Sequence, residues 1–117
     1  MIVADSFVIA DWTDPGVTSR ERPIAGLHVH RSDDEAWYVL SGRLGFQVGE
    51  EEVEVEPGGS LLVSHGTPHS YWNAVAEPTR YLLVMTPRIH HLIETLHSGE
   101  RDDWAQIFEE HESELLA

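Results

Sequence analysis

The chain has 117 residues, which is enough for one domain with a single modest hydrophobic core. Its 21 acidic and 7 basic residues give a net charge of −14, and a field of that sign repels nucleic-acid phosphates and anionic membrane surfaces. The absence of cysteine excludes disulfides, thiolate catalysis and cysteine-based zinc sites. We find no signal-peptide pattern and no run near the roughly 18 apolar residues of a membrane span, so we expect a cytoplasmic protein.

Most of the chain alternates between short runs of aromatic and branched residues and turn signals built from glycine, proline and aspartate. Strands are expected over residues 6–10, 24–30, 35–40, 44–48, 52–55, 61–63, 69–75 and 81–85. The alternation of apolar and acidic residues in 52–55 predicts that this strand forms a hairpin with 44–48 and that one face of the hairpin is exposed to solvent. About eight short strands in a cysteine-free chain indicate an all-β sandwich or barrel of the jelly-roll kind.

The last part of the chain changes its period. Pro87 can open a helix, and Ile89, Leu92, Ile93 and Leu96 then recur at helical spacing. A second amphipathic stripe follows, made of Trp104, Ile107, Phe108 and His111, with Leu115 beyond. We therefore expect one domain over residues 1–117, with a barrel over about 1–86 and a helical tail over about 88–116 that packs on the barrel or across a dimer interface. Four histidines of the tail, His90, His91, His97 and His111, are interpreted as surface or interface residues.

Two histidines stand close together in the second expected strand. His28 and His30 point to the same face because side chains on a strand alternate with period two. Glu35 opens the next strand after a short turn, so its carboxylate can reach back toward both imidazoles. Imidazole nitrogens with a carboxylate oxygen are a donor set that suits first-row transition metals. Asp33 and Asp34 are alternative carboxylates, although their place in a turn explains them better.

The spacing of these residues forms two motifs. His28, His30, Glu35 and Gly42 read H-x-H-x4-E-x6-G, and a second set, Gly58, Gly66, His69 and Asn73, reads G-x7-G-x2-H-x3-N. Together they resemble the two motifs of the cupin superfamily over about residues 22–84, and small single-domain cupins of the type-2 kind in particular. Two positions depart from the family pattern, Arg22 in place of glycine and Ser64 in place of proline, and both affect loop stiffness rather than the ligands.

The resemblance implies a double-stranded β-helix, that is a jelly-roll barrel, followed here by one or two C-terminal helices. It also implies that His28, His30, Glu35 and His69 bind one divalent transition metal, which can be Fe, Mn, Ni, Co, Cu or Zn. The alternative is a binding-only cupin that has lost its metal.

A substrate pocket is expected beside this site. Tyr71 and Asn73 share a strand face with His69, and Trp37 shares one with Glu35, so Trp37, Tyr71 and Asn73 are candidate pocket residues for a small aromatic or apolar molecule. Plain packing is the alternative for each, and Asn73 can instead fix a turn. His65 is either a group that supports the site from the nearby loop or an exposed histidine.

Three functions fit the resemblance. The first is a metal-dependent dioxygenase similar to quercetinase-like and diketone-cleaving cupins, in which an enolate chelates the metal and Glu35 is both a ligand and the catalytic proton acceptor. The second is a non-redox isomerase, epimerase or lyase, which the absence of lysine and the few arginines disfavour for phosphorylated substrates. The third is a sensory module that binds a small molecule without turnover. The family often pairs its barrels through an edge strand, and residues 1–10 offer one, so we expect a homodimer.

Overall fold

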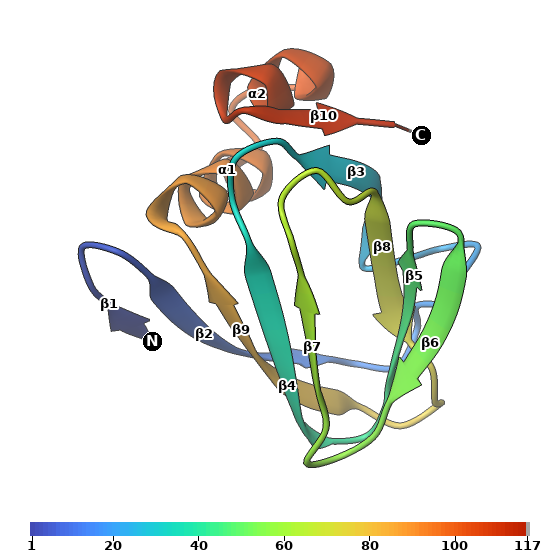
Figure 1. The fold of residues 1–117 in the computed structure, drawn as a ribbon. Helices are drawn as coiled ribbons and strands as arrows, with labels where there is room; N and C mark the ends of the chain where they lie inside the picture. Colours follow the sequence, from blue (N-terminus) through green and yellow to red (C-terminus); the bar gives the residue numbers. More distant parts are fainter. Residues whose placement is uncertain (117) are drawn as a thin grey trace.

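Two five-stranded antiparallel sheets face each other in the computed structural model, which describes residues 1–116 (Figure 1). The first sheet has the order β1-β2-β9-β4-β7, with strands Ile2–Val3, Val8–Asp14, Thr79–Met85, Glu35–Ser41 and Ser60–Val63. The second has the order β10-β3-β8-β5-β6, with strands Ser113–Leu115, Ala25–His30, His69–Asn73, Leu44–Val48 and Glu51–Val55. The predicted jelly-roll barrel with C-terminal helices is confirmed.

The hydrophobic core fills the space between the sheets. Alternate residues of β4 and β9 point inward, so that Trp37, Val39, Tyr81 and Leu83 are almost completely buried. Phe46 packs its ring edge-on against Trp37 across the barrel, with a ring-centre distance of 5.1 Å. Aromatic residues of this size bury large areas and favour such edge-on contacts. The core therefore closes the barrel at one end and leaves the other end for the polar cluster described below.

One tight turn explains a glycine of the first motif. Gly42 follows β4 with a φ of 83°, a left-handed value that other residues rarely adopt. A Cβ atom at this position would lie 2.7 Å from the Cα of Thr79. The backbones approach so closely here that only glycine fits.

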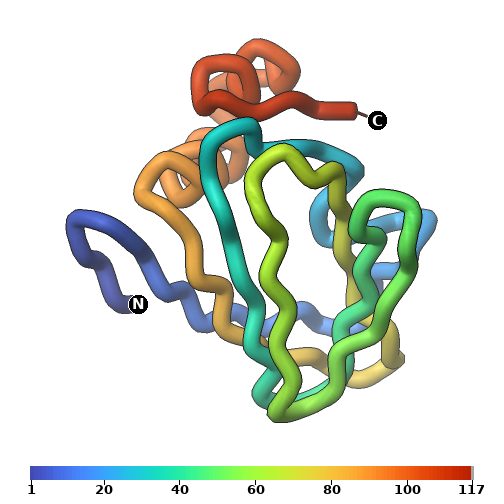
Figure 2. Tube along the Cα trace, viewed as in Figure 1, coloured from blue at the N-terminus to red at the C-terminus, as the bar shows by residue number. Residues whose placement is uncertain are grey.

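The C-terminal extension, residues 87–116, lies across one end of the barrel, beside β3 (Figures 1 and 2). Helix α1, Pro87–Ser98, begins at Thr86, whose hydroxyl accepts a hydrogen bond from the Ile89 amide, and it ends at Gly99. Helix α2 spans Trp104–Glu110. No helix within residues 1–116 is long and apolar enough to cross a membrane.

The apolar spacing had suggested that the extension is helical to its end, but residues near its end form a strand. Helix α2 stops at His111, Glu112 adopts a positive φ of 52°, and Ser113–Leu115 forms β10 against the free edge of β3. A strand of three residues carries too short a pattern to be read locally. Its pairing depends on an edge of β3 that only the folded barrel presents.

Candidate metal centre

Four side chains from three strands meet at the open end of the barrel. His28 and His30 lie on β3, Glu35 is the first residue of β4, and His69 is the first residue of β8. Their potential ligand atoms all lie within 4.8 Å of one another, and all four residues are buried. We refer to them as the HHEH cluster. The two motifs, which lie far apart in the sequence, therefore meet in space.

Strand pairing sets this geometry. β3 and β8 are antiparallel neighbours in which His28 lies directly opposite His69, and the two rings are 4.3 Å apart. His30 follows on the same face, with its ring 4.8 Å from that of His28. Glu35 comes from the facing sheet, which brings the carboxylate in from the side opposite the imidazoles. Glu35 can lie this close to His30 because only a short turn separates the end of β3 from the start of β4.

The two alternative carboxylates of that turn face away from the cluster. Asp34 accepts hydrogen bonds from the main chain and the ring of His65, both at 2.8 Å. Asp33 lies 3.4 Å from the Arg88 guanidinium of α1. Both residues therefore stabilise loops, and His65 is exposed rather than part of the cluster.

Burial and mutual hydrogen bonding tune the charges of the cluster. Burial lowers the pKa of His28 to about 4, and the nearby His69 and His30 rings act in the same direction, so His28 is neutral at pH 7. Burial alone would raise the pKa of Glu35, but hydrogen bonds from His30 and His69 outweigh it and lower the pKa to about 2. The Glu35 Oε1 atom lies 3.1 Å from His30 Nε2 and 2.6 Å from His69 Nε2. A neutral imidazole beside an ionised carboxylate is the protonation state that metal binding requires.

The cluster fits a divalent transition metal. Ligand atoms placed about 2.1 Å from one ion lie roughly 3–4 Å from each other. The potential ligand atoms of these four residues already lie within 4.8 Å of one another, which is close to that separation. The Nδ1 atoms of His28 and His69 lie 2.6 and 2.9 Å from the carbonyl oxygens of Gly26 and Thr67. Since a carbonyl only accepts, both Nδ1 atoms donate, so Nε2 is the nitrogen of each ring that would bind an ion. Three nitrogens and one oxygen would leave about two positions of an octahedron for other ligands.

A cavity of about 380 Å³ opens from the cluster toward the C-terminal extension. His28, His30 and Glu35 lie in its wall, whereas His69 does not. Most of the remaining wall is aromatic or aliphatic, with contributions from the barrel and from the extension: Trp12, Ile24, Ala25, Tyr71, Tyr81, Leu83, Ile89, Leu92, Ile93, Leu96, Trp104, Phe108 and Leu115. In the part of the chain that the structure describes, this wall contains no arginine or lysine.

Of the three residues expected in the pocket, Tyr71 lies in the cavity wall, whereas Trp37 and Asn73 do not. Tyr71 places its hydroxyl 3.0 Å from that of Tyr81, and burial raises the pKa of Tyr71 well above its usual value. Trp37 is packed into the core, with its ring 5.3 Å from that of Tyr71 and 5.9 Å from that of His69. Asn73 fixes the turn after β8, because its side chain bonds the main chain of Val75 and Glu77.

Two of the four histidines that were interpreted as surface or interface residues have specific places in the extension. His97 is exposed and lies at the cavity wall. His111 is buried, and its Nε2 lies 2.6 Å from Nδ1 of His91 on the neighbouring helix. The two residues are twenty positions apart on separate helices, so no local pattern could reveal their contact.

Comparison with known proteins gives the following matches. The sequence model of a family described as "Cupin domain" matches residues 19–85. An uncharacterized protein of Streptomyces coelicolor is 32% identical over 74 residues, which is 63% of this chain and 63% of that protein, so the match spans less than two thirds of the relative.

Solved structures agree with the fold. The crystal structure of TT1209 from Thermus thermophilus superimposes with a TM-score of 0.61 at 29% identity, over 74% of this chain and 77% of that chain. An uncharacterized conserved protein with a double-stranded β-helix domain from Klebsiella pneumoniae also gives a TM-score of 0.61, at 25% identity, over 74% of this chain and 68% of that chain. Neither description names a substrate.

Proposed function

This chain belongs to the cupin domain family, and we propose that it is a metal-dependent enzyme of the dioxygenase kind that acts on a small, largely apolar molecule. The observation that carries the proposal is the position of the HHEH cluster at the inner end of a mostly apolar cavity. Three of the four cluster residues face this space, so a molecule in the cavity would contact the same centre that holds the ion. A cavity with this size and lining suits a small organic ligand.

The charge of the wall narrows the class of substrate. The cavity contains the carboxylates of Asp14 and Glu35 and no arginine or lysine among the described residues that line it. At the centre itself, a divalent ion together with the Glu35 carboxylate would leave a net charge of about +1, which matches one monoanionic chelating group. An enolate of a flavonol or a β-diketone has this charge and an apolar body. The Asp14 carboxylate is bonded to Gly16 and Thr18 and adds only negative charge to the wall. A substrate with two or more negative charges would lack a counter-charge.

The residues of the chain have separate roles in this proposal. His28, His30, Glu35 and His69 hold the ion, which when bound would supply Lewis acidity that lowers the pKa of a chelated enol. Glu35 then accepts the enol proton. Its carboxylate belongs to the cavity wall, where it can meet that proton. The aromatic and aliphatic wall holds the body of the substrate and excludes water.

Oxygen uptake tests the reaction. Protein purified without a metal-chelating tag should contain stoichiometric metal by elemental analysis and should consume oxygen with a flavonol or a β-diketone, with loss of uptake after chelation. The Glu35→Gln variant keeps the size of the side chain but lacks the carboxylate, so it should lose turnover, whereas Glu94→Gln on the exposed side of α1 should not. Turnover without oxygen consumption would contradict the dioxygenase and support a metal-dependent isomerase or lyase. Stoichiometric metal with ligand binding but no turnover would support a sensory module.

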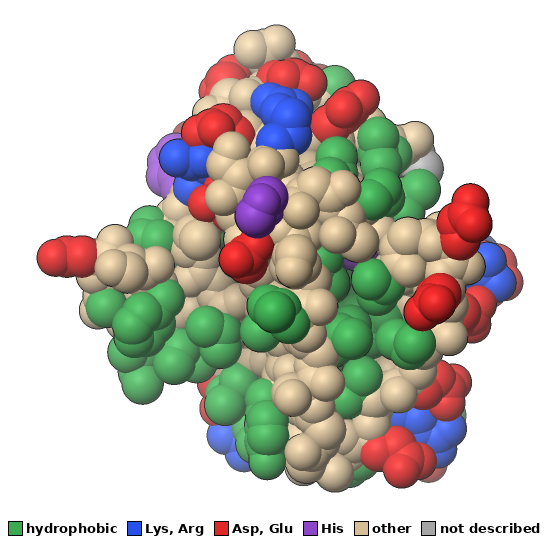
Figure 3. Space-filling model, in the orientation of Figure 1, with side chains coloured by type: hydrophobic (Ala, Val, Ile, Leu, Met, Phe, Trp, Pro, Cys, Tyr) green, Lys and Arg blue, Asp and Glu red, His purple; other side chains and the backbone are tan. Residues whose placement is uncertain are grey.

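We also propose that two copies of the chain pair through the outer face of the first sheet. Apolar side chains lie on that face in neighbouring strands, among them Ile2 on β1, Tyr38 and Leu40 on β4, and Leu62 on β7, and all four are exposed. Figure 3 shows hydrophobic side chains gathered over β1 and β2 and in front of β4 and β7. This face also carries the Asp11–Arg80 ion pair, whose charges cancel. In a chain with net charge −14, a face without net charge is the surface that two copies can bring together without repulsion.

Light scattering tests the dimer. We expect the mass of two chains for the wild type and of one chain for Leu62→Glu, because the new carboxylates would face each other in the contact. Leu116→Glu adds the same charge at an exposed position of the C-terminal extension and should remain dimeric. A monomeric wild type would contradict the proposal.

A further inference from the structure

His30 differs from the other two histidines of the cluster in the group that supports its ring. His28 and His69 each bond a carbonyl two residues earlier in the chain, at Gly26 and Thr67. The Nδ1 atom of His30 instead lies 2.7 Å from the hydroxyl oxygen of Ser113, which is 83 residues away on β10. Support for His30 therefore comes from the C-terminal extension, outside the residues that match the family model.

The second bond of the Ser113 hydroxyl fixes the direction of the first. Ser113 Oγ lies 3.0 Å from the carbonyl oxygen of His111, and since a carbonyl only accepts, the hydroxyl donates its one proton there. In this arrangement it accepts from His30, so Nδ1 of that ring carries a proton. Nε2, which lies 3.1 Å from Glu35 Oε1, is then the nitrogen that would bind an ion in place of that contact. Ser113 thus imposes on His30 the same tautomer that two carbonyls impose on His28 and His69.

The strand β10 holds this hydroxyl in place. In the antiparallel pairing with β3, Ser113 lies opposite His30 and Leu115 lies opposite His28. The Arg31 amide donates to the Glu112 carbonyl at 2.8 Å on one side of the pair. The Ser113 side chain is completely buried, so water does not compete for its bonds.

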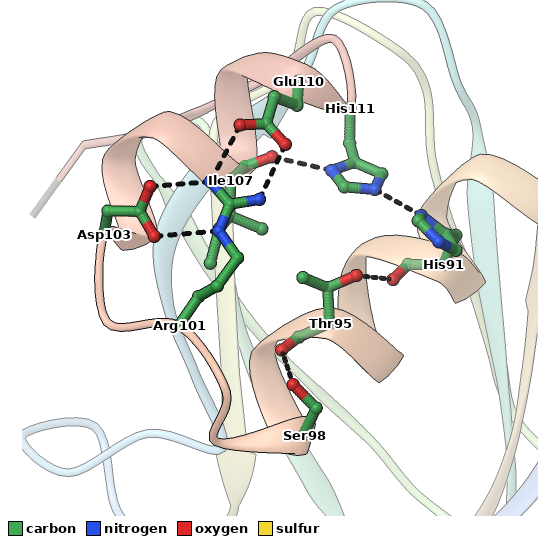
Figure 4. A network of polar contacts seen from close by, with 8 residues as sticks. All are labelled: His91, Thr95, Ser98, Arg101, Asp103, Ile107, Glu110 and His111. Atoms are coloured by element: carbon green, nitrogen blue, oxygen red, sulfur yellow. Dashed lines mark hydrogen bonds and ion pairs between the residues drawn. The ribbon is translucent and has the colours of Figure 1, made fainter.

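Helix α2 in turn anchors the start of β10. His111 follows the last residue of α2, donates from Nδ1 to the Ile107 carbonyl at 2.7 Å, and contacts His91 of α1 through Nε2 (Figure 4). Arg101 joins Asp103 at the start of the helix to Glu110 at its end. The His111 carbonyl that receives the Ser113 proton is therefore part of a fixed helix end rather than of a loose tail.

We propose that Ser113 is a positioning residue for the metal centre, through which the C-terminal extension orients His30 and sets its tautomer. This inference rests on the proposed metal centre. It means that docking of the extension and binding of the ion are coupled: each stabilises the other, because the same hydrogen bond serves both. The barrel carries all four candidate ligands, and the extension of this chain supplies the hydrogen bond that holds one of them, His30.

Cobalt affinity tests the coupling. In Ser113→Ala the His30 ring loses its acceptor, and we expect Co(II) affinity to fall about 10- to 100-fold, with a changed ligand-field spectrum, as for other groups that orient metal-bound histidines. Ser113→Thr keeps the hydroxyl and should restore most of the affinity. The matched control is Ser32→Ala, which removes a hydroxyl that bonds Glu112 at the same junction but does not touch the cluster.

A metal-free measurement separates the two proposals. Long-range ¹H–¹⁵N spectra report which nitrogen of His30 carries the proton in chelator-treated protein. We expect an Nδ1–H in the wild type, and in Ser113→Ala a ring that has lost this Nδ1 proton and is protonated on Nε2, which faces the Glu35 carboxylate. Wild-type protein that binds no Co(II) would contradict the metal centre itself. Wild-type affinity together with an unchanged His30 tautomer in Ser113→Ala would contradict the role of Ser113 alone.

Discussion

The barrel carries all four side chains of the HHEH cluster, whereas the C-terminal extension contributes one hydroxyl to it and the outer wall of the cavity. His28 and His69 are supported by carbonyls of their own strands or loops, so their orientation is built into the barrel. His30 depends on Ser113, and Phe108 of α2 packs its ring 5.8 Å from that of His28. A common fold can therefore keep its ligand set while an added segment changes how one ligand is held and what the cavity admits.

The two regions also differ in how they are stabilised. The main core is made mostly by the barrel, with Trp37, Phe46 and Tyr81, and takes in Ile89 from α1. The extension has a separate small cluster of Leu92, Ile107 and Phe108. A region with so few buried side chains opens more readily than the rest of the molecule. The following predictions test whether the two regions are as distinct as this difference indicates.

The largest effect is expected from the barrel side of the site. His69→Ala removes a ligand that is almost completely buried, and we expect metal affinity to fall by more than about 100-fold, beyond the loss typical of a supporting residue. Elemental analysis after gel filtration measures the change. His65→Ala, which removes an exposed histidine four residues earlier, should keep its metal. Undiminished metal in His69→Ala would exclude the cluster as the binding site.

A core substitution in the extension should act mainly on the extension. Ile107→Ala removes a completely buried side chain from the small cluster and should cost about 2–5 kcal/mol locally. Hydrogen exchange should then speed up in α2 and β10 while the strands β4 and β9 keep their protection. Equal acceleration in the barrel would show that the two regions unfold as one unit.

The barrel should also have a characteristic pH dependence. The folded pKa of His28, about 4, is below its ordinary value of 6.5, so as pH falls the unfolded chain takes up the proton first. The free energy of unfolding should therefore decrease between pH 6.5 and pH 4, by about 3 kcal/mol for this residue. The pKa of Glu35, lowered from 4.5 to about 2, acts in the same direction between pH 4.5 and pH 2.

Urea unfolding of chelator-treated protein between pH 4 and pH 7 measures this slope. The His28→Gln variant should lose the part of the slope that belongs to His28, and the difference between the two curves removes the contribution of the other histidines. Parallel curves for the variant and the wild type would contradict a neutral, buried His28.

The smallest effect is expected from the surface of the extension. Arg101 bonds both Asp103 and Glu110, but all three side chains are partly exposed (Figure 4). Arg101→Ala should therefore cost at most about 1 kcal/mol in thermal unfolding and leave metal affinity unchanged. A loss of metal in this variant would mean that the helix end and the cluster are more tightly coupled than the path through Ser113 implies.

The sequence by itself determined the fold class and identified the four cluster residues as one set. Alternating apolar residues made β4 and β9 recognisable, and two spaced motifs linked His28, His30 and Glu35 to His69. These features are local: a strand shows its period within a few residues, and a motif keeps its spacing whatever surrounds it.

Only the tertiary structure decided which other residues reach the site. Trp37 and Tyr71 both point into the barrel, yet only Tyr71 lies in the cavity wall, because the faces that strand periodicity assigns do not say which end of a barrel a side chain reaches. Ser113 was not predictable at all. It meets His30 because the chain reverses after α2 and adds a short strand to the free edge of β3. Such contacts arise from pairing between distant segments, and no local pattern in the sequence records them.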